Sequence, residues 1–598
     1  MNIPRPEYPR PDLRRAAWRN LNGRWDFAPD ERDPSAAQGW PGEACRAMSI
    51  VVPFPVESRL SGIGDPRPHP VVWYRRSFPA ARPRAGERLL LHLGAVDYEA
   101  TLWLNGRELG SHRGGYTPFS FDITEVVRDG DNTLLVRVID TLSPDQPRGK
   151  QYWRETPAGI WYDRTTGIWQ TVWLETVPAT HIRRLRLTPD LPGGMLQVEA
   201  EIDGDAGSFA LQAVALDIGQ EVARAESGRG EHTLVLRIPE PRPWSPESPH
   251  LYDLQVSLLA GEQVIDRVDS YFGLRSVERQ GRNILLNGRP YYQRLVLDQG
   301  YWPEGQYTAP SDGALRADCL WIRQYGYNGA RKHQKIEDPR WLYWCDRLGL
   351  LVWGEMPGCG LYHYSPQVME NVRHEWPQVI ARDYNHPCIV TWVPFNESWG
   401  IWGIRERPDV QEGVSGVVDM TRLLDPTRLV IDNSGWEHVN TDIADVHSYL
   451  RTGEQLHVWW PCYRSGQTYI VDSGHPFFAD DYQYGGEPVI VSEYGGMALS
   501  NFPPPEDKPL QACGVDSPDA YLKHYHDLTR AILDMEDVCG FCFTQLTDVE
   551  GEVNGVLTYD RRPKVDPAVI ATYNQEAPAK FPIAMQAPAE ACTLPYLL

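Results

Sequence analysis

The sequence predicts three consecutive domains: a jelly-roll β-sandwich at residues 1–180, an immunoglobulin-like β-sandwich at 181–275, and a (β/α)8 TIM barrel with a C-terminal extension at 276–598. Short segments of alternating apolar and polar residues fill the first two regions, as is typical of half-buried strands. In the third region, apolar runs alternate with helical patterns, which favours parallel strands joined by helices. A chain of 598 residues is long enough for several domains of about 100–200 residues each.

The first region carries several predicted strands and one clear hairpin signal. Asn105 and Gly106 stand between two strand-like segments, and this pair supplies the positive φ angles of a tight hairpin turn. A number of strands with such turns predicts a jelly-roll-like sandwich. The predicted strands include residues 89–93, 100–104, 134–138 and 171–175.

The second region continues the strand pattern in about 95 residues, a length that suits a small immunoglobulin-like sandwich. Residues 181–187, 196–200 and 233–238 alternate in the manner of strands, and the Pro-rich stretch 239–246 is expected to be a loop.

The third region is predicted to be a barrel. A doubly wound sheet is the structural alternative, and the lack of a Gly-rich phosphate loop at the start of any helix disfavours it. The tail after about residue 575 is rich in Ala and Pro and is expected to lie on the surface. Predicted strands are residues 350–353, 389–393, 489–491 and 541–543, and predicted helices are 339–348 and 520–534.

Composition excludes some functions. The formal net charge of −22 argues against a nucleic-acid partner, because phosphate binding needs a basic surface. No run of about 18 apolar residues occurs, so no membrane span is expected, and no apolar signal region opens the chain, so a cytoplasmic protein is expected.

The ten cysteines are scattered, and we expect them to be reduced. The 22 Trp and 29 Tyr fit core packing and also the apolar faces of sugars.

Two glutamates follow predicted barrel strands. Residues 389–393 lead to Glu397, and residues 489–491 lead to Glu493. The carboxyl ends of barrel strands meet at one face, so the two side chains are expected to share a site. Retaining cleavage of a glycosidic bond needs two carboxylates about 5–5.5 Å apart, one as nucleophile and one as general acid/base. Either glutamate alone could instead be a salt-bridge partner at the start of a loop.

The surroundings of these glutamates resemble those of glycoside hydrolase family 2, the β-galactosidase, β-glucuronidase and β-mannosidase family. The sequence Asn-Glu-Ser at 396–398 and Ser-Glu-Tyr-Gly-Gly at 492–496 carry the resemblance. Further segments match in order over nearly the whole chain: residues 21–27, 167–174, 272–276, 286–290, 326–331 and 345–350.

This resemblance implies roles by position. Glu397 matches the acid/base, and Glu493 matches the nucleophile. Asn396 matches the residue that holds the sugar 2-hydroxyl, a contact that strengthens in the transition state. Tyr449 is the candidate to hydrogen-bond the nucleophile. His447 is a candidate sugar contact or a structural histidine.

Five further residues are candidates at the same face. Arg331 is expected to orient the nucleophile and keep it ionised, and His333 follows the same strand. Glu355 is a candidate sugar contact. Asp298 either binds sugar hydroxyls or caps a loop, and Trp399 either forms an aromatic wall or packs beneath its loop.

Three departures from the family pattern bear on substrate and metal. Where β-glucuronidases of the family carry Asn-x-Lys for the sugar carboxylate, this chain has Glu552 and Asn554, which disfavours uronic acids. Thr544 stands near the point where many relatives have a Trp beneath the sugar. Residues 355–357 lack the His of the magnesium site of large β-galactosidases, so we expect no essential metal and no other cofactor.

The sequence therefore predicts a retaining exo-glycosidase, a hydrolase of O-glycosyl bonds that removes a terminal neutral β-linked hexose or pentose, with galactose first. The alternatives are β-glucuronidase, β-mannosidase, arabinosidase or galactofuranosidase activity, or a non-catalytic carbohydrate-binding protein. The expected partner is a carbohydrate substrate, with no nucleic acid and no membrane. Relatives often form dimers or tetramers, so a homo-oligomer stays open.

Overall fold

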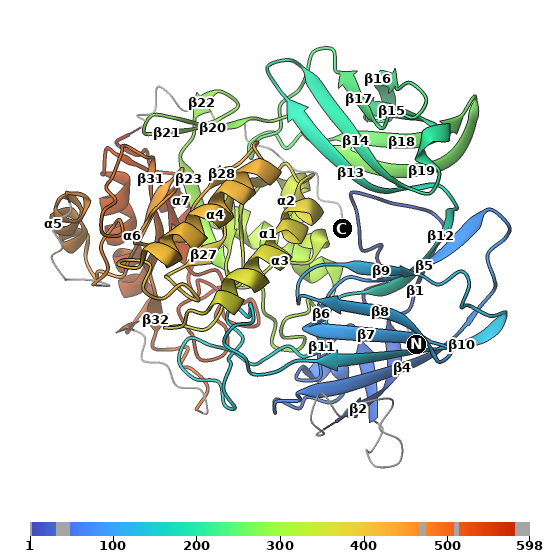
Figure 1. Cartoon of the computed structure of the whole chain (residues 1–598). Coiled ribbons are helices and arrows are strands. Elements are labelled where there is room, and N and C mark those ends of the chain that lie inside the picture. Colours follow the sequence, from blue (N-terminus) through green and yellow to red (C-terminus); the bar gives the residue numbers. More distant parts are fainter. Residues whose placement is uncertain (1–2, 31–47, 466–473, 507–512, 581–598) are drawn as a thin grey trace.

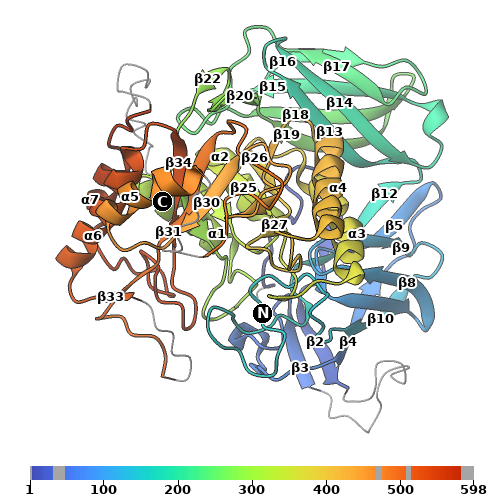
Figure 2. The same ribbon diagram turned by 60° about the vertical axis from the view of Figure 1, so that its left-hand side comes forward.

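The computed structural model describes residues 3–30, 48–465, 474–506 and 513–580. It shows a jelly-roll β-sandwich, an immunoglobulin-like β-sandwich and a TIM barrel in chain order, so the predicted fold class is confirmed. In Figure 1 the barrel lies on the left, and the two sandwiches lie on the right, one above the other. The rotated view in Figure 2 shows α3 and α4 of the barrel facing the two sandwiches.

The N-terminal sandwich has two main sheets. One has the strand order β3-β2-β4-β10-β7-β8, and the other has the order β1-β12-β5-β9. Asn105 and Gly106 have φ angles of 53° and 83° and join β7 to β8, as the hairpin signal predicts. The strands are β1 Trp18–Asn20, β2 Gly23–Pro29, β3 Met48–Val52, β4 Val71–Ala80, β5 Glu87–Leu93, β6 Val96–Asp97, β7 Glu99–Leu104, β8 Arg107–Arg113, β9 Phe119–Asp122, β10 Gly130–Ile139, β11 Gly167–Ile168 and β12 Val172–Pro178, and the 3-10 helix η2 covers Arg59–Ser61.

The second sandwich packs a sheet of order β13-β14-β17 against a sheet of order β16-β15-β18-β19. Alternate residues of its strands face one apolar core, which explains the period of two in the sequence. Its elements are β13 His181–Asp190, β14 Met195–Asp203, η3 Ala206–Ser208, β15 Ala210–Asp217, β16 Gln220–Glu226, β17 Thr233–Arg237, β18 Tyr252–Ala260 and β19 Gln263–Phe272.

The barrel is a parallel sheet of order β28-β26-β25-β24-β23-β34-β31-β30, with helices packed outside it. Its strands are almost wholly buried, which explains their continuous apolar runs. The strands are β23 Gln293–Asp298, β24 Gly329–Lys332, β25 Leu351–Glu355, β26 Ile389–Val393, β28 Leu429–Val430, β30 Ala444–Ser448, β31 Val489–Gly495 and β34 Val538–Thr544. The helices are α1 Asp312–Gln324, α2 Pro339–Leu348, α3 Pro366–Asp383, α4 Pro408–Leu424, α5 Gly453–Arg464, α6 Pro518–Leu533 and α7 Pro567–Asn574.

Short strands accompany the barrel: β20 Val277–Gln280, β21 Asn283–Leu286, β22 Arg289–Pro290, β27 Phe395–Asn396, β29 Asn433–Ser434, β32 Met497–Leu499 and β33 Cys513–Val515. The predicted helix at 339–348 coincides with α2. The predicted strand at 489–491 is longer than expected, because β31 continues to Gly495 and therefore contains Glu493. Most of the predicted C-terminal tail, residues 581–598, lies outside the described residues.

The changes of architecture fall between β12 and β13 and between β19 and β20. We propose the domain boundaries 1–180, 181–275 and 276–598 on this basis. Within the described part of the chain, no helix is both long enough and apolar enough to cross a membrane.

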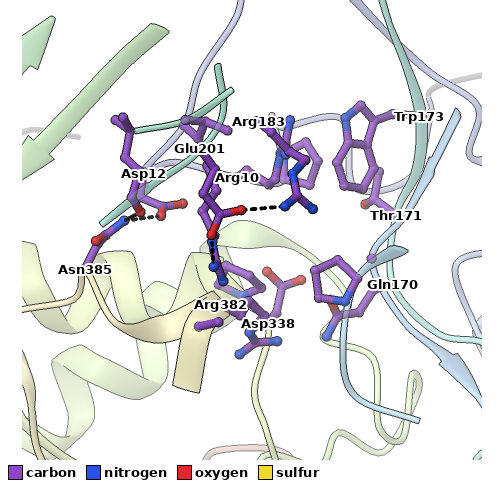
Figure 3. Close-up of a pocket in the computed structure, with 18 residues that line it drawn as sticks. Arg10, Asp12, Gln170, Thr171, Trp173, Arg183, Glu201, Asp338, Arg382 and Asn385 are labelled. Carbon is purple, nitrogen blue, oxygen red and sulfur yellow. Dashed lines mark hydrogen bonds and ion pairs between the residues drawn. The ribbon is translucent and has the colours of Figure 1, made fainter. Parts of the chain in front are cut away.

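The three domains meet around a cavity of about 250 Å³ that all three help to line. Figure 3 shows Glu201 of the second sandwich paired with Arg183, and Asp12 near Asn385 of the barrel. Trp173 of β12 closes one side. None of the residues predicted to act in catalysis lines this cavity, so it is separate from the site described next.

Candidate active site

The segment that carries Glu397 leaves the barrel strand β26 in a constrained turn. The short strand β27 pairs in parallel with β29, and Glu397 N–H donates to the Ser434 carbonyl at 2.9 Å. Glu397 and Ser398 have φ angles of 49° and 60°, the left-handed region that side chains other than glycine rarely adopt. Ser398 N–H donates to Asn433 Oδ1 at 2.9 Å, which helps to hold this turn. Such strained positions persist where surrounding contacts fix them, and they cluster at functional sites.

Glu493 is aimed by an irregularity in strand β31. Val446 of β30 faces Val491 of β31, but the next residue, His447, faces Glu493. The extra residue, Ser492, forms a bulge, and a bulge re-aims the side chain that follows it. Glu493 thereby comes to lie beside His447, and it is 5% exposed.

The two glutamates converge. Ligand atoms of Glu397, His447 and Glu493 all lie within 4.8 Å of one another. His447 stands between them, with Nδ1 2.8 Å from Glu397 Oε1 and Nε2 3.4 Å from Glu493 Oε1. One carboxylate oxygen of each glutamate therefore lies within 4.8 Å of the other, which fits the roughly 5–5.5 Å of retaining pairs better than the roughly 6.5–9.5 Å of inverting pairs, which need room for a water.

Arg331 organises this cluster from β24. It is fully buried, and its Nη1 donates to Glu493 Oε1 at 3.0 Å. Its Nε donates to Glu355 Oε2 at 2.6 Å, and its Nη2 donates to Asn396 Oδ1. One planar guanidinium therefore fixes three acceptors from three barrel strands or their extensions.

The charges around Glu493 keep it ionised. Burial alone would favour the neutral carboxyl, but His447 and Arg331 outweigh it and hold the pKa of Glu493 at about 2. The Tyr449 hydroxyl adds a hydrogen bond to Oε2 at 2.5 Å. A carboxylate in this environment is negatively charged at neutral pH, as a nucleophile must be.

Asn396 has a free donor at the same place. Its Oδ1 is occupied by Arg331, whereas its Nδ2 is buried and has no hydrogen-bond partner among the residues that the structure describes. A buried donor without a partner costs free energy, and a substrate hydroxyl would satisfy it.

Four predicted site residues make contacts within the protein that account for them without a sugar. Glu355 is fully buried and accepts hydrogen bonds from Arg331 and from Gln334 N–H at 2.9 Å, so it supports the arginine rather than facing the substrate. Asp298 pairs with Lys332 at 2.6 Å and accepts from Gly300 N–H, which is the loop-capping alternative.

Trp399 is 2% exposed, and its ring centroid lies 5.6 Å from that of Trp161, so it packs beneath its loop rather than forming an open wall. His333 is also buried, and its Nδ1 lies 2.9 Å from Glu355 Oε1. His333 therefore contacts the carboxylate that binds Arg331.

Glu397, His447 and Glu493 have a geometry that suits a cation, because their two carboxylates and one imidazole converge. The guanidinium of Arg331 already lies 3.0 Å from both Glu493 Oε1 and His447 Nε2. A metal ion at this point would be repelled by that positive charge.

The contact of the first domain with the barrel was not predicted from the sequence. The connection between β10 and β11, residues 140–166, reaches the barrel and brings Lys150 and Tyr162 to Glu552. The Tyr162 hydroxyl donates to Glu552 Oε2 at 2.5 Å. A cluster of aromatic residues in this connection was the available signal, but nothing in its local pattern names a partner about 400 residues away.

Glu552 and Asn554, which the sequence analysis singled out, are both buried and contact each other. Asn554 Nδ2 donates to Glu552 Oε1 at 3.3 Å, and Asn554 Oδ1 accepts from Gln545 Nε2 at 2.7 Å. Thr544, at the end of β34, lies 3.3 Å from the Tyr449 hydroxyl. The end of β34 therefore lies beside the tyrosine that holds Glu493.

Comparison with known proteins agrees with this architecture. Residues 18–178 match the sugar binding domain of glycosyl hydrolases family 2, residues 180–275 match the model named glycosyl hydrolases family 2, and residues 277–571 match its TIM barrel domain. The β-glucuronidase of Rattus norvegicus is 27% identical over 91% of this chain and 88% of its own length. A β-galactosidase of Thermoanaerobacter pseudethanolicus is 29% identical over 55% of this chain and 45% of its own length.

Among solved structures, the β-glucuronidase of Ruminococcus gnavus has a TM-score of 0.77 at 19% identity, and the match covers 96% of this chain and 100% of that one. At this identity the likeness concerns the fold. The three family models together span nearly the whole chain in the expected order, and the chain therefore belongs to glycosyl hydrolases family 2.

Proposed function

We propose that this glycosidase removes a terminal neutral sugar from β-glycosides by double displacement, with galactose as the first candidate. The observation that supports it most is the convergence of Glu397 and Glu493 within 4.8 Å. In the first step Glu493 attacks the anomeric carbon while Glu397 donates a proton to the leaving oxygen. In the second step Glu397 takes a proton from water, and that water releases the sugar from Glu493.

The neighbours fit these roles. Arg331 and Tyr449 hold the nucleophile through both of its oxygens, which leaves little freedom of orientation. Asn396 Nδ2 is the donor for the 2-hydroxyl, the contact whose strengthening in the transition state lowers the barrier.

A neutral sugar is favoured by the charge balance after β34. Asn554 stands where the resemblance places the Lys that binds a sugar carboxylate, and Glu552 adds a negative charge beside it. A uronate at this position would meet a carboxylate rather than a free cation.

A β-uronidase is the second candidate. The relatives include β-glucuronidases of several organisms, and Lys150 offers an ammonium next to Glu552. The same stretch of the chain thus contains both a negative group and a positive group, and activity measurements decide between the two candidates.

The test is a panel of nitrophenyl β-glycosides: galactoside, glucoside, mannoside, glucuronide, galacturonide, arabinoside and galactofuranoside. We expect the highest kcat/KM on a neutral sugar, with galactoside first, and loss of turnover in Glu493→Gln. Cleavage of uronides alone would overturn the neutral assignment. Unchanged activity in Glu493→Gln would overturn the mechanism.

A further inference from the structure

The connection from β10 to β11 is anchored on the barrel at several points. The N–H groups of Arg148 and Gly149 both donate to the Gly358 carbonyl at 2.9 Å. Asp163 N–H donates to Glu550 Oε1 at 3.0 Å. Where the connection leaves the sandwich, Arg148 pairs with Asp140 at 3.0 Å, and both side chains are 2% exposed. These contacts fix the position of the residues between them.

Lys150 is a charged residue of this connection that contacts the barrel. Its side chain is buried, and its only hydrogen bond within the described part of the chain is a long one, 3.5 Å, to Glu552 Oε2. Its Nζ also lies 5.8 Å from the centroid of the Trp399 ring and 5.6 Å from that of Tyr162. An ammonium has three donors, so two of them are not used by these contacts.

Lys150 lies against two loops that follow barrel strands, and one of them is the loop that carries Glu397. Trp399 is two residues beyond Glu397, on the loop after β26. Glu552 lies on the loop after β34, and β34 ends at Thr544, which touches the tyrosine that holds Glu493. Lys150 thus lies between the loop that carries Glu397 and the loop that follows β34, the neighbour of the strand that carries Glu493.

The alternative to a binding role is a structural ion pair. Burial of a lysine is costly, and a buried pair offsets that cost only with short, well-formed hydrogen bonds. Other lysines of the barrel have such bonds: Lys332 lies 2.6 Å from Asp298, and Lys564 lies 2.6 Å from Asp548. Lys150 lacks one, although the hydroxyl of Tyr162 approaches the same carboxylate to 2.5 Å.

We propose that Lys150 and Glu552 together bind the sugar hydroxyls remote from the anomeric carbon, and that the net charge of this pair sets the choice between neutral and acidic sugars. The inference rests on the proposed function and extends it. Lys150 donates to a sugar oxygen, and Glu552 balances its charge and repels a sugar carboxylate. Without the charge of Glu552, the ammonium becomes a partner for a uronate.

The test measures kcat/KM of purified variants of the full chain on nitrophenyl galactoside, glucuronide and galacturonide. Glu552→Gln keeps the shape and the acceptor for Tyr162 but removes the charge, and we expect the ratio of uronide to galactoside activity to rise at least tenfold. Lys150→Met should lose about 10- to 100-fold in kcat/KM on the neutral sugar, mostly through KM, the effect of one hydrogen bond to a charged group.

Two controls separate selectivity from folding. Glu412→Gln removes a charge from the exposed surface of α4, and its selectivity should equal that of the wild type. Lys150→Arg should restore most of the affinity that Lys150→Met loses, and melting temperatures report on folding. An unchanged uronide-to-galactoside ratio in Glu552→Gln, or the same shift in Glu412→Gln, overturns the inference.

The same measurements distinguish a failure of this inference from a failure of the proposed function. If the wild-type enzyme prefers a uronide, the neutral-sugar assignment is wrong, yet the ratio in Glu552→Gln still reports on the pair and must rise. If the wild-type enzyme prefers a neutral sugar and the ratio stays constant, the proposed function stands and the role of the pair falls.

Discussion

At the scale of residues, the proposed site contains groups that would meet a substrate and groups that hold them in position. Glu397, Glu493 and Asn396 present atoms to the place where a sugar would react. Arg331 holds Glu493 and Asn396, Tyr449 holds Glu493, and His447 contacts Glu397. The left-handed backbone at Glu397 belongs to the same arrangement, because β27 and β29 hold the turn by hydrogen bonds to its neighbours.

The acid/base role of Glu397 predicts a dependence on the leaving group. Glu397→Ala should lose about 10²- to 10⁴-fold in rate on substrates with poor leaving groups, because their oxygen needs a proton, and far less on dinitrophenyl glycosides. Azide should partly restore turnover of the latter by attacking the glycosyl-enzyme. Glu412→Ala, exposed on α4, serves as the control. Equal losses on both substrates without azide rescue would contradict the role.

At the scale of elements, the barrel strands place the proposed catalytic groups, and a connection of the first sandwich docks on the barrel. Glu397 follows β26 and the short strand β27, and Glu493 lies near the carboxyl end of β31, as expected for the carboxyl face of a barrel. The connection between β10 and β11 adds side chains from another domain. Its seating requires a glycine, since a Cβ at Gly149 would lie 2.0 Å from the Gln334 carbonyl oxygen.

This close approach predicts that Gly149→Ala displaces the connection. We expect a lower melting temperature and at least a tenfold lower kcat/KM, mostly through KM, since Lys150 follows directly. Gly159→Ala is the matched control: it has a similar φ of +65°, but its nearest neighbour is 3.7 Å away. Both variants carry the left-handed backbone cost of about 1–2 kcal/mol, so the difference between them measures the contact. Equal activity of the two variants would show that the seating does not matter.

At the scale of the whole molecule, the sequence predicts the architecture well because strand and helix periods are local. The period of two in the sandwiches and the alternation in the barrel follow from which faces are buried. The hairpin at Asn105 and Gly106 and the helix α2 follow from turn and capping residues, with Asp338 accepting from Arg340 N–H.

The site was only partly predictable, because its contacts join residues that are distant in the sequence. Glu397 and Glu493 stand at strand ends that can be recognised locally, and Tyr449 follows another such strand. Whether Glu355 faces a sugar or an arginine depends on the packing of adjacent strands, which no period encodes. Lys150 meets Glu552 only through the docking of one domain on another.

Stability of the whole molecule should depend on a buried histidine between β29 and β30. His438 Nδ1 lies 2.7 Å from Asp432, and this carboxylate outweighs burial and raises the pKa of His438 to about 9. A group with a raised pKa in the folded state adds stability below its unfolded pKa, near 6.5, and that stability is lost as the pH rises through about 9.

The wild type should therefore exceed His438→Gln in melting temperature by more at pH 6 than at pH 10. Thermal unfolding at a series of pH values measures this difference. A difference that stays constant across that range would show that the imidazole is not charged in the folded protein.

The central claim is that Glu493 forms a covalent bond to the sugar while Glu397 moves the proton. The most direct measurement is mass spectrometry of the enzyme after reaction with a 2-deoxy-2-fluoro β-glycoside that has a good leaving group, followed by peptide mapping. The account predicts one added sugar mass, located on Glu493. A label on another residue, or turnover of the reagent with inversion and no labelled enzyme, would contradict it.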